Sequence, residues 1–437
     1  MILEIVKKIL SKYPLCDSCL GRQFGGLLKG VTNKERGRVL KFVLALEGHL
    51  EFLKEGNEEL LKILVKNGNS QLAMKILNVK NEEFKCYLCE GIMDSLENIV
   101  NKVVEALNEY EFSNFLIGVR VAGDLAERED KLRSEFGIEF GESMRMECSR
   151  EIGKEVSKIT GKNVEFKNPD IVAIINIPSF EINVKSMPLY IFGRYRKLVR
   201  GIPQSKWYCS KCRGKGCEKC NWTGKMYETS IEELISEPIL KITNGKKAKF
   251  HGAGREDVDA IVLGNGRPFV IEIKEPKKRN LDLKLLEEEI NKNANGKIEV
   301  FELKYSNKKT IKRLKEGAKI AEKTYRALVE VKREIKNEDL EKIEKSFNGC
   351  IINQYTPTRV LHRRVDKLRI KKVYEMKAKK VNDRMMELIV RCQGGLYVKE
   401  LISGDGGRTR PSVAEILGTE AKCIELDVIS VNEGMEK

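Results

Sequence analysis

The sequence lacks three features, and each absence excludes a class of protein. None of its apolar runs approaches the roughly 18 residues that a membrane-spanning helix needs. The N-terminal stretch has helical periodicity but no signal-peptide cleavage pattern. No glycine-rich cofactor loop follows a strand and opens a helix, which argues against a methyltransferase. We therefore expect a cytoplasmic protein without a membrane segment.

Positive charge is in excess. Lysine and arginine number 81 against 65 acidic residues, which gives a net charge of +16. Such an excess favours a polyanionic partner, and nucleic acid is the natural one. A thermophile-type surface, rich in both lysine and glutamate, is the alternative. That surface would be closer to neutral, so we expect nucleic acid.

Cysteine is used in pairs. Of twelve cysteines, eight form four C-x-x-C pairs. In a cytosolic chain this pattern indicates metal binding rather than disulfides, and a redox C-x-x-C would require a βαβ setting that is missing. The first two pairs predict one closed four-cysteine zinc site that joins two segments. The last two, spaced C-x2-C-x4-C-x2-C, predict a second structural zinc site. The predicted ligands are Cys16, Cys19, Cys86, Cys89, Cys209, Cys212, Cys217 and Cys220.

The pattern of apolar residues predicts an α+β protein. Residues 34–80 have helical spacing, and residues 92–200 alternate between helix-like and strand-like stretches. After residue 239, strand-like runs outnumber helices and predict a mainly antiparallel mixed sheet. In Phe250–Lys274, Gly264-Asn265-Gly266 separates two apolar runs and predicts a β-hairpin.

Residues 168–198 resemble the close of a THUMP domain, an RNA-binding module of tRNA-modifying enzymes. The resemblance rests on Asn168-Pro169-Asp170, two alternating strands and the run Gly193–Lys197. Basic side chains around Tyr195 would suit a phosphate backbone, or would be a solvated strand end. We expect a zinc-containing, THUMP-like α/β domain over 1–204. A zinc-knuckle linker over 205–238 and a catalytic domain over 239–437 would follow.

Four blocks of the C-terminal half resemble the archaeal tRNA pseudouridine synthase that modifies uridines 54 and 55 of the TΨC loop. These blocks are residues 251–269, 323–329, 354–364 and 394–405. The resemblance covers most of the chain. It implies a pseudouridine synthase domain, tRNA as the partner, no catalytic cofactor, structural zinc and no obligatory protein partner.

The same resemblance implies a role for each residue of the site. Asp257 would be the single catalytic carboxylate, attacking C1′ or abstracting the C2′ proton of a flipped uridine. Arg255 would orient Asp257, and Tyr325 would stack on the target base. Lys399 would pair with the aspartate. Tyr397 and Leu426 would wall the pocket. Independently of the resemblance, the charge of the basic segment 359–372 would let it hold tRNA phosphates, with a solvated strand face as the alternative. Its basic residues include Arg359, Arg363, Arg364 and Arg369.

Two readings compete with this one. Asp259 followed by Glu272-Ile273-Lys274 spells D…E-x-K, the pattern with which PD-(D/E)xK nucleases bind Mg²⁺, and a hairpin would bring the two acids together. The pattern is short and explains none of the later blocks. A non-catalytic, zinc-dependent RNA-binding protein is the second alternative.

Overall fold

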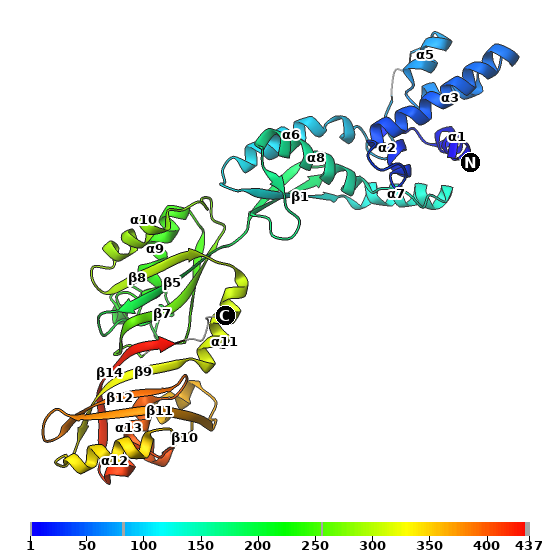
Figure 1. The fold of residues 1–437 in the computed structure, drawn as a ribbon. Helices are drawn as coiled ribbons and strands as arrows, with labels where there is room; N and C mark the ends of the chain where they lie inside the picture. Colours follow the sequence, from blue (N-terminus) through cyan, green and yellow to red (C-terminus); the bar gives the residue numbers. More distant parts are fainter. Residues whose placement is uncertain (1, 81–83, 255–256, 433–437) are drawn as a thin grey trace. The chain divides into compact units, whose positions relative to one another are not determined.

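The computed structural model describes residues 2–80, 84–254 and 257–432. The chain divides into two compact units, Met1–Met187 and Pro188–Lys437 (Figure 1). Across these described ranges, no helix combines the length and the apolar character that crossing a membrane requires.

The first unit begins with helices. These are α1 (Ile2–Lys12), α2 (Asp17–Gly21), α3 (Asn33–Glu55), α4 (Glu59–Lys66) and α5 (Gln71–Leu77). Thr32 and Glu35 form a capping box that starts α3, and Gly56 ends it in a left-handed conformation. Helices α2 and α3 cross so closely that a Cβ on Gly21 would lie 1.8 Å from the Asn33 carbonyl oxygen. This contact fixes α2, which carries Cys19.

A four-stranded sheet follows in the same unit, in the order β2-β1-β3-β4. Its strands are β1 (Asn114–Val121), β2 (Asn163–Val164), β3 (Ile171–Ile177) and β4 (Glu181–Ser186). Strand β1 runs parallel to β3, and β3 pairs antiparallel with β4. Helices α6 (Leu96–Leu107) and α8 (Met144–Thr160) pack against this sheet, and α7 (Gly123–Phe136) connects β1 to α8 (Figure 1). The predicted α/β character of this region is confirmed.

The second unit is built on a ten-stranded sheet in the described part of the chain, with the path β13-β10-β11-β12-β9-β14-β7-β5-β8 and β6 paired to β7. The strands are β5 (Leu189–Lys197), β6 (Lys247–Gly252), β7 (Ile261–Lys274), β8 (Ile298–Tyr305), β9 (Glu322–Val331), β10 (Ile351–Gln354), β11 (Arg369–Lys380), β12 (Met385–Gln393), β13 (Thr409–Arg410) and β14 (Ala421–Asn432). Neighbouring strands are antiparallel except β14 and β7. This confirms the predicted mixed, mainly antiparallel sheet.

Two apolar cores cover different parts of this sheet. Helices α9 (Ile231–Thr243) and α10 (Leu283–Asn293) pack over β5, β7 and β8. Helices α12 (Asn337–Phe347), α13 (Val398–Ser403) and α14 (Val413–Leu417) pack beside β9 to β12. Helix α11 (Lys308–Ile320) connects β8 to β9. The first residues of β7 pair with β14, and a further small apolar cluster of Val262, Val428 and Val431 lies at that junction.

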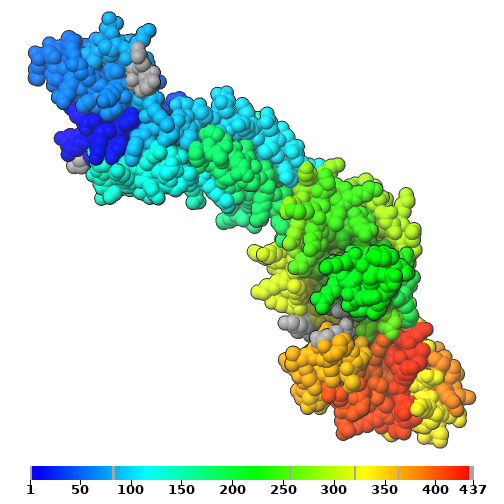
Figure 2. Space-filling view, turned by 180° about the vertical axis from the view of Figure 1, so that it is seen from behind, coloured from blue at the N-terminus to red at the C-terminus, as the bar shows by residue number. Residues whose placement is uncertain are grey.

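The division between the units differs from the one expected from sequence. Strand β5 was assigned to an N-terminal domain ending at residue 204, but it pairs with β7 and β8 in the second unit. The knuckle segment 205–227 also belongs to the second unit and lies on its surface (Figure 2, bright green). A strand that alternates apolar and basic residues does not reveal which sheet it joins, and the compact units divide after residue 187 and not after residue 204.

The hairpin predicted at Gly264-Asn265-Gly266 is wrong. Both apolar runs belong to the single strand β7, and the three residues form a bulge within it. Gly264 and Gly266 have φ of 57° and 64°, and a Cβ on Gly264 would lie 2.0 Å from the Ile429 carbonyl oxygen. At the bulge, the Asn265 side chain takes the place of backbone hydrogen bonds between β7 and β14. Its amide nitrogen donates to Val431 O at 2.8 Å, and its amide oxygen accepts from Val431 N at 2.9 Å.

Candidate functional site

The residues predicted for the active site line one cavity of about 370 Å³ in the second unit. It is bordered by the segment before β7, by β9, by the turn after β10, by the segment before α13 and by β14. Seven predicted residues line it: Asp257, Tyr325, Arg359, Arg364, Tyr397, Lys399 and Leu426. Arg255 lies outside the described residues, and the described part of Arg363 is its backbone in the turn Thr358–Arg363.

Asp257 faces two cations. Its Oδ1 accepts a hydrogen bond from Arg359 Nη1 at 3.3 Å, and its Oδ2 lies 3.3 Å from Arg359 Nη2. Lys399 Nζ lies 3.7 Å from the same Oδ2. The Asp257 side chain is 34% exposed, so it does not lie in a sealed apolar interior. A half-exposed carboxylate held by two cations is open to a substrate.

Lys399 has a closer partner, Asp259. Its ammonium donates to Asp259 Oδ2 at 2.7 Å. Partial burial of Asp259 disfavours its charge, but the Lys399 ammonium outweighs this and lowers the pKa of Asp259 below its ordinary value. In this structure Lys399 therefore bridges two aspartates.

Tyr325, Tyr397 and Leu426 come from three different elements. Tyr325 lies on β9 opposite Val428 of β14, and Leu426 lies two residues before Val428 on the same strand. Tyr397 precedes α13, and its hydroxyl accepts from Arg364 Nη1 at 3.1 Å. The tyrosines are half-buried and Leu426 is buried, so they form walls of the cavity.

The backbone around Asp257 is held by the last residue of β5 and by a residue shortly after it. Lys197 is fully buried, and its ammonium donates to the carbonyls of Val258 at 2.6 Å and Asp257 at 3.4 Å. Arg200 Nη1 donates to Asp259 O at 2.7 Å. Neither reading of the basic run Gly193–Lys197, an RNA contact or a solvated strand end, holds for Tyr195 and Lys197, because both side chains are fully buried.

Three further polar residues of the site lie outside the predicted set. Arg267 and Lys323 line the cavity, and buried Glu400 contacts Arg359. All three fall inside the sequence blocks that carry the family resemblance, but those blocks do not show which side chains are buried. Arg369, from the predicted basic segment, also lines the cavity.

The nuclease pattern is not assembled. Asp259 precedes β7, and Glu272 lies near the far end of that strand. Val262 and Glu272 face residues seven apart on β5, so at about 3.3 Å per residue the two acids are separated by roughly 20 Å or more. Glu272 Oε2 lies 3.1 Å from His251 Nε2, whereas Asp259 pairs with Lys399. The proximity expected for these acids depended on the hairpin and fails with it.

The first two cysteine pairs converge in the first unit. The sulfurs of Cys16, Cys19, Cys86 and Cys89 lie within 4.8 Å of one another. A zinc–sulfur bond of about 2.3 Å requires tetrahedral sulfur separations of about 3.8 Å. Cys16 Sγ and Cys89 Sγ lie 3.7 Å apart, and Cys19 N donates to Cys16 Sγ at 3.4 Å. This donor set fits zinc.

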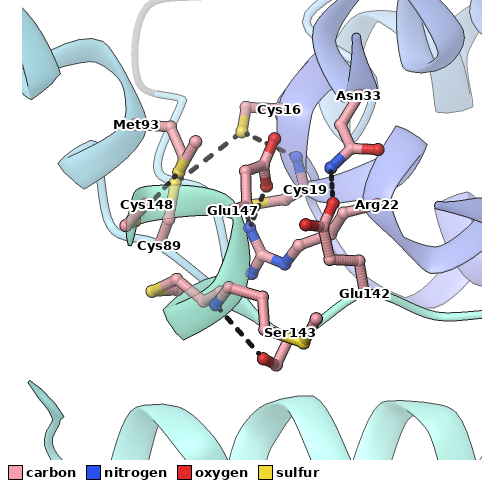
Figure 3. Close-up of polar contacts among 12 residues, drawn as sticks. Cys16, Cys19, Arg22, Asn33, Cys89, Met93, Glu142, Ser143, Glu147 and Cys148 are labelled. Carbon is pink, nitrogen blue, oxygen red and sulfur yellow. Dashed lines mark hydrogen bonds and ion pairs between the residues drawn. The ribbon is translucent and has the colours of Figure 1, made fainter. Parts of the chain in front are cut away.

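A buried arginine connects this cluster to the THUMP-side helices (Figure 3). Arg22 Nη1 donates to Cys19 Sγ at 3.1 Å, and its Nε donates to Glu129 of α7 at 2.7 Å. Its Nη1 also lies 3.5 Å from Glu147 of α8. Because all three charged side chains are buried, the cysteine cluster and these helices are electrostatically coupled.

The second cluster lies in the segment 205–227. Cys209, Cys212, Cys217 and Cys220 also bring their sulfurs within 4.8 Å of one another. The 209–217 and 212–220 sulfur pairs are each separated by 3.8 Å. Backbone N–H groups of Gly216 and Gly224 donate to these sulfurs at 3.3 and 3.2 Å. This set could likewise hold a tetrahedral metal ion.

Two family profiles match the chain. "Pus10, C-terminal" matches residues 190–432, and "Pus10 THUMP domain, archaeal" matches residues 99–176. The chain belongs to the Pus10 family. The predicted resemblance is therefore confirmed, with the THUMP match at 99–176 and all of β5 except Leu189 inside the C-terminal match.

Curated relatives agree over nearly the full length. A Methanocaldococcus jannaschii protein is 47% identical over 442 residues, covering 99% of this chain and 95% of that protein. A Thermofilum pendens protein is 44% identical over 433 residues, covering 98% and 95%. Both are named "tRNA pseudouridine synthase Pus10". Among solved structures, a chain of "Crystal Structure of a Cbf5-Nop10-Gar1 Complex" aligns with 55% of this chain and 48% of its own at 17% identity and a TM-score of 0.31.

Proposed function

We propose that this Pus10-family chain is a tRNA pseudouridine synthase that isomerises uridines 54 and 55 of the TΨC loop. The observation that carries the proposal is the single cavity in which Asp257, Tyr325, Lys399 and Leu426 meet. Family membership and the names of its relatives support the reaction and the tRNA substrate. The positions 54 and 55 rest on the resemblance alone.

The chemistry needs one carboxylate. The N1–C1′ bond of uridine breaks, the detached base turns, and a C5–C1′ bond forms. C5 then loses its proton, and N1 gains one. Asp257 serves as the nucleophile at C1′ or as the base at C2′, so overall no atom is gained or lost. Neither route calls for a redox or metal cofactor, and the target base must leave the stack first.

The other residues hold the nucleotide. Tyr325 stacks on the flipped base, while Tyr397 and Leu426 wall the pocket. Lys399 pairs with Asp257. Arg255 orients Asp257 and occupies the space that the flipped base leaves. Arg363 and Arg364 neutralise phosphates of the bound tRNA. The zinc ions are structural and keep both cysteine clusters closed.

We further infer that the protein acts on tRNA in the cytoplasm without an obligatory protein partner. Basic side chains around the cavity support direct contact with RNA. They include Arg364 and Arg369, which line it, and the net charge of +16 has the same sign.

An assay with a metal chelator tests the reaction class. Incubation of the protein with an unmodified tRNA transcript in EDTA is expected to yield pseudouridine at positions 54 and 55, read by digestion and position mapping. Strand cleavage that requires Mg²⁺ would instead support a nuclease. Binding without either product would support the non-catalytic RNA-binding alternative.

A further inference from the structure

Arg359 lies between two carboxylates that come from distant parts of the second unit. Its Nε donates to Glu400 Oε1 at 2.7 Å. Its Nη1 and Nη2 each lie 3.3 Å from an oxygen of Asp257. All three nitrogens of the guanidinium are thus engaged with acids, and the pairing with Asp257 is two-pronged. Such a pairing fixes the plane of a carboxylate, which a single ammonium does not.

The backbone of Arg359 is held as well. The preceding residue, Thr358, donates its N–H to Asp405 Oδ2 at 2.9 Å. Arg408 Nη2 donates to Thr356 O at 3.0 Å, and the following residue, Val360, is buried. Arg359 is therefore fixed at its backbone and along its guanidinium, unlike a flexible basic arm that reaches for phosphate.

Glu400 holds the outer edge of this guanidinium. Its side chain is only 6% exposed, and it belongs to α13 directly after Lys399. Burial raises the pKa of Glu400, and the Arg359 guanidinium opposes that rise. Its other oxygen, Oε2, is buried without a hydrogen-bond partner. A buried acid in this position has no means of contacting RNA, so its contact with Arg359 is its role in the site.

We propose that Arg359 is a positioning residue for Asp257, held in place by Glu400, and not a ligand of tRNA phosphate. The inference rests on the proposed function and deepens it, because it assigns a chain of three residues to the orientation of the reacting carboxylate. Lys399 does not replace Arg359, since Lys399 Nζ is 3.7 Å from Asp257 and 2.7 Å from Asp259.

The two roles for Arg359 predict opposite results. Loss of a phosphate ligand weakens tRNA binding. It also reduces the magnitude of the slope of log association constant against log salt concentration by about one. Loss of a positioning residue leaves binding unchanged and slows the chemical step. A misplacement of about 1 Å costs on the order of 10²-fold in rate.

The test uses the full-length, zinc-loaded protein and three variants. Arg359→Lys removes the two-pronged pairing but keeps the charge. Glu400→Leu removes the acceptor of Nε, and Glu400→Gln keeps an acceptor oxygen. The matched control is Arg333→Lys. Arg333 makes a similar two-pronged pair with Asp339, with both N–O distances at 2.7 Å, and it does not line the cavity. Its side chain is 38% exposed, like that of Arg359. Melting curves establish that each variant is folded.

We expect Arg359→Lys and Glu400→Leu to lower the single-turnover rate at saturating tRNA by about 10²-fold, with unchanged Kd and unchanged salt slope. Glu400→Gln should recover much of the Glu400→Leu loss, and Arg333→Lys should match the unaltered protein. A normal saturating rate for Arg359→Lys would overturn the inference, because lysine still neutralises a phosphate but cannot form the two-pronged pairing with Asp257. So would a normal rate for Glu400→Leu. Absence of pseudouridine with the unaltered protein would instead overturn the proposed function.

Discussion

Asp257→Asn is expected to abolish pseudouridine formation while tRNA binds with unchanged affinity. The amide has the shape of the carboxylate and can still accept a hydrogen bond from Arg359, so the cavity keeps its form. It can neither attack C1′ nor take the C2′ proton. We expect the single-turnover rate to fall by at least about 10³-fold, as when a catalytic nucleophile or base is removed. Pseudouridine mapping together with a binding titration measures both quantities.

Asp259→Asn is the informative companion variant. Asp259 is two residues away and more exposed, at 63%, and its partner is Lys399. Its loss should change the rate far less than the loss of Asp257, because it carries no step of the reaction. Turnover retained by Asp257→Asn, or a larger defect at Asp259, would remove Asp257 from the catalytic role.

Two zinc ions per chain are expected, and loss of the buried one should unfold the first unit. Cys19, Cys86 and Cys89 are buried, and Cys19 also binds Arg22. Because such a site does not exist in the unfolded chain, its metal-binding free energy, about 10–16 kcal/mol in small zinc domains, contributes to folding. Cys19→Ser should therefore lose one zinc and the cooperative melting transition of this unit. Elemental analysis and calorimetry measure the two effects.

Cys148→Ala provides the control for that experiment. Cys148 is also buried, and its Sγ lies 3.8 Å from the Met93 sulfur, but it is outside the group of four (Figure 3). Its substitution should leave the zinc content at two and lower the melting temperature slightly at most. A protein without zinc would contradict both metal proposals. A content of one zinc ion per chain would mean that only one of the two cysteine clusters binds zinc.

Much of the site could be predicted because its signals are short and local. The spacing of Cys209 to Cys220 is a zinc knuckle in itself, and the blocks around Asp257, Tyr325 and Lys399 carry the family resemblance. Long strands such as β9 and β14 follow from alternation over consecutive residues. These features depend on chemistry within a few positions of the chain.

The partners of these elements depend on residues far away in sequence. Strand β5 joins β7, some 70 positions later, and the bulge at Gly264 forms because β14 approaches it within the sheet. The role of Arg359 changes from phosphate ligand to the proposed support of Asp257, because the two residues are 102 positions apart and meet in the folded sheet.

The family, the two cysteine clusters, the mixed sheet and seven of the residues that line the cavity could therefore be predicted from the sequence. Where the units divide, that the hairpin is a bulge and which cation contacts which acid became known from the folded structure. The physical reason is that sheet partners and buried ion pairs are selected by packing and desolvation between distant segments, which no local pattern of residues encodes.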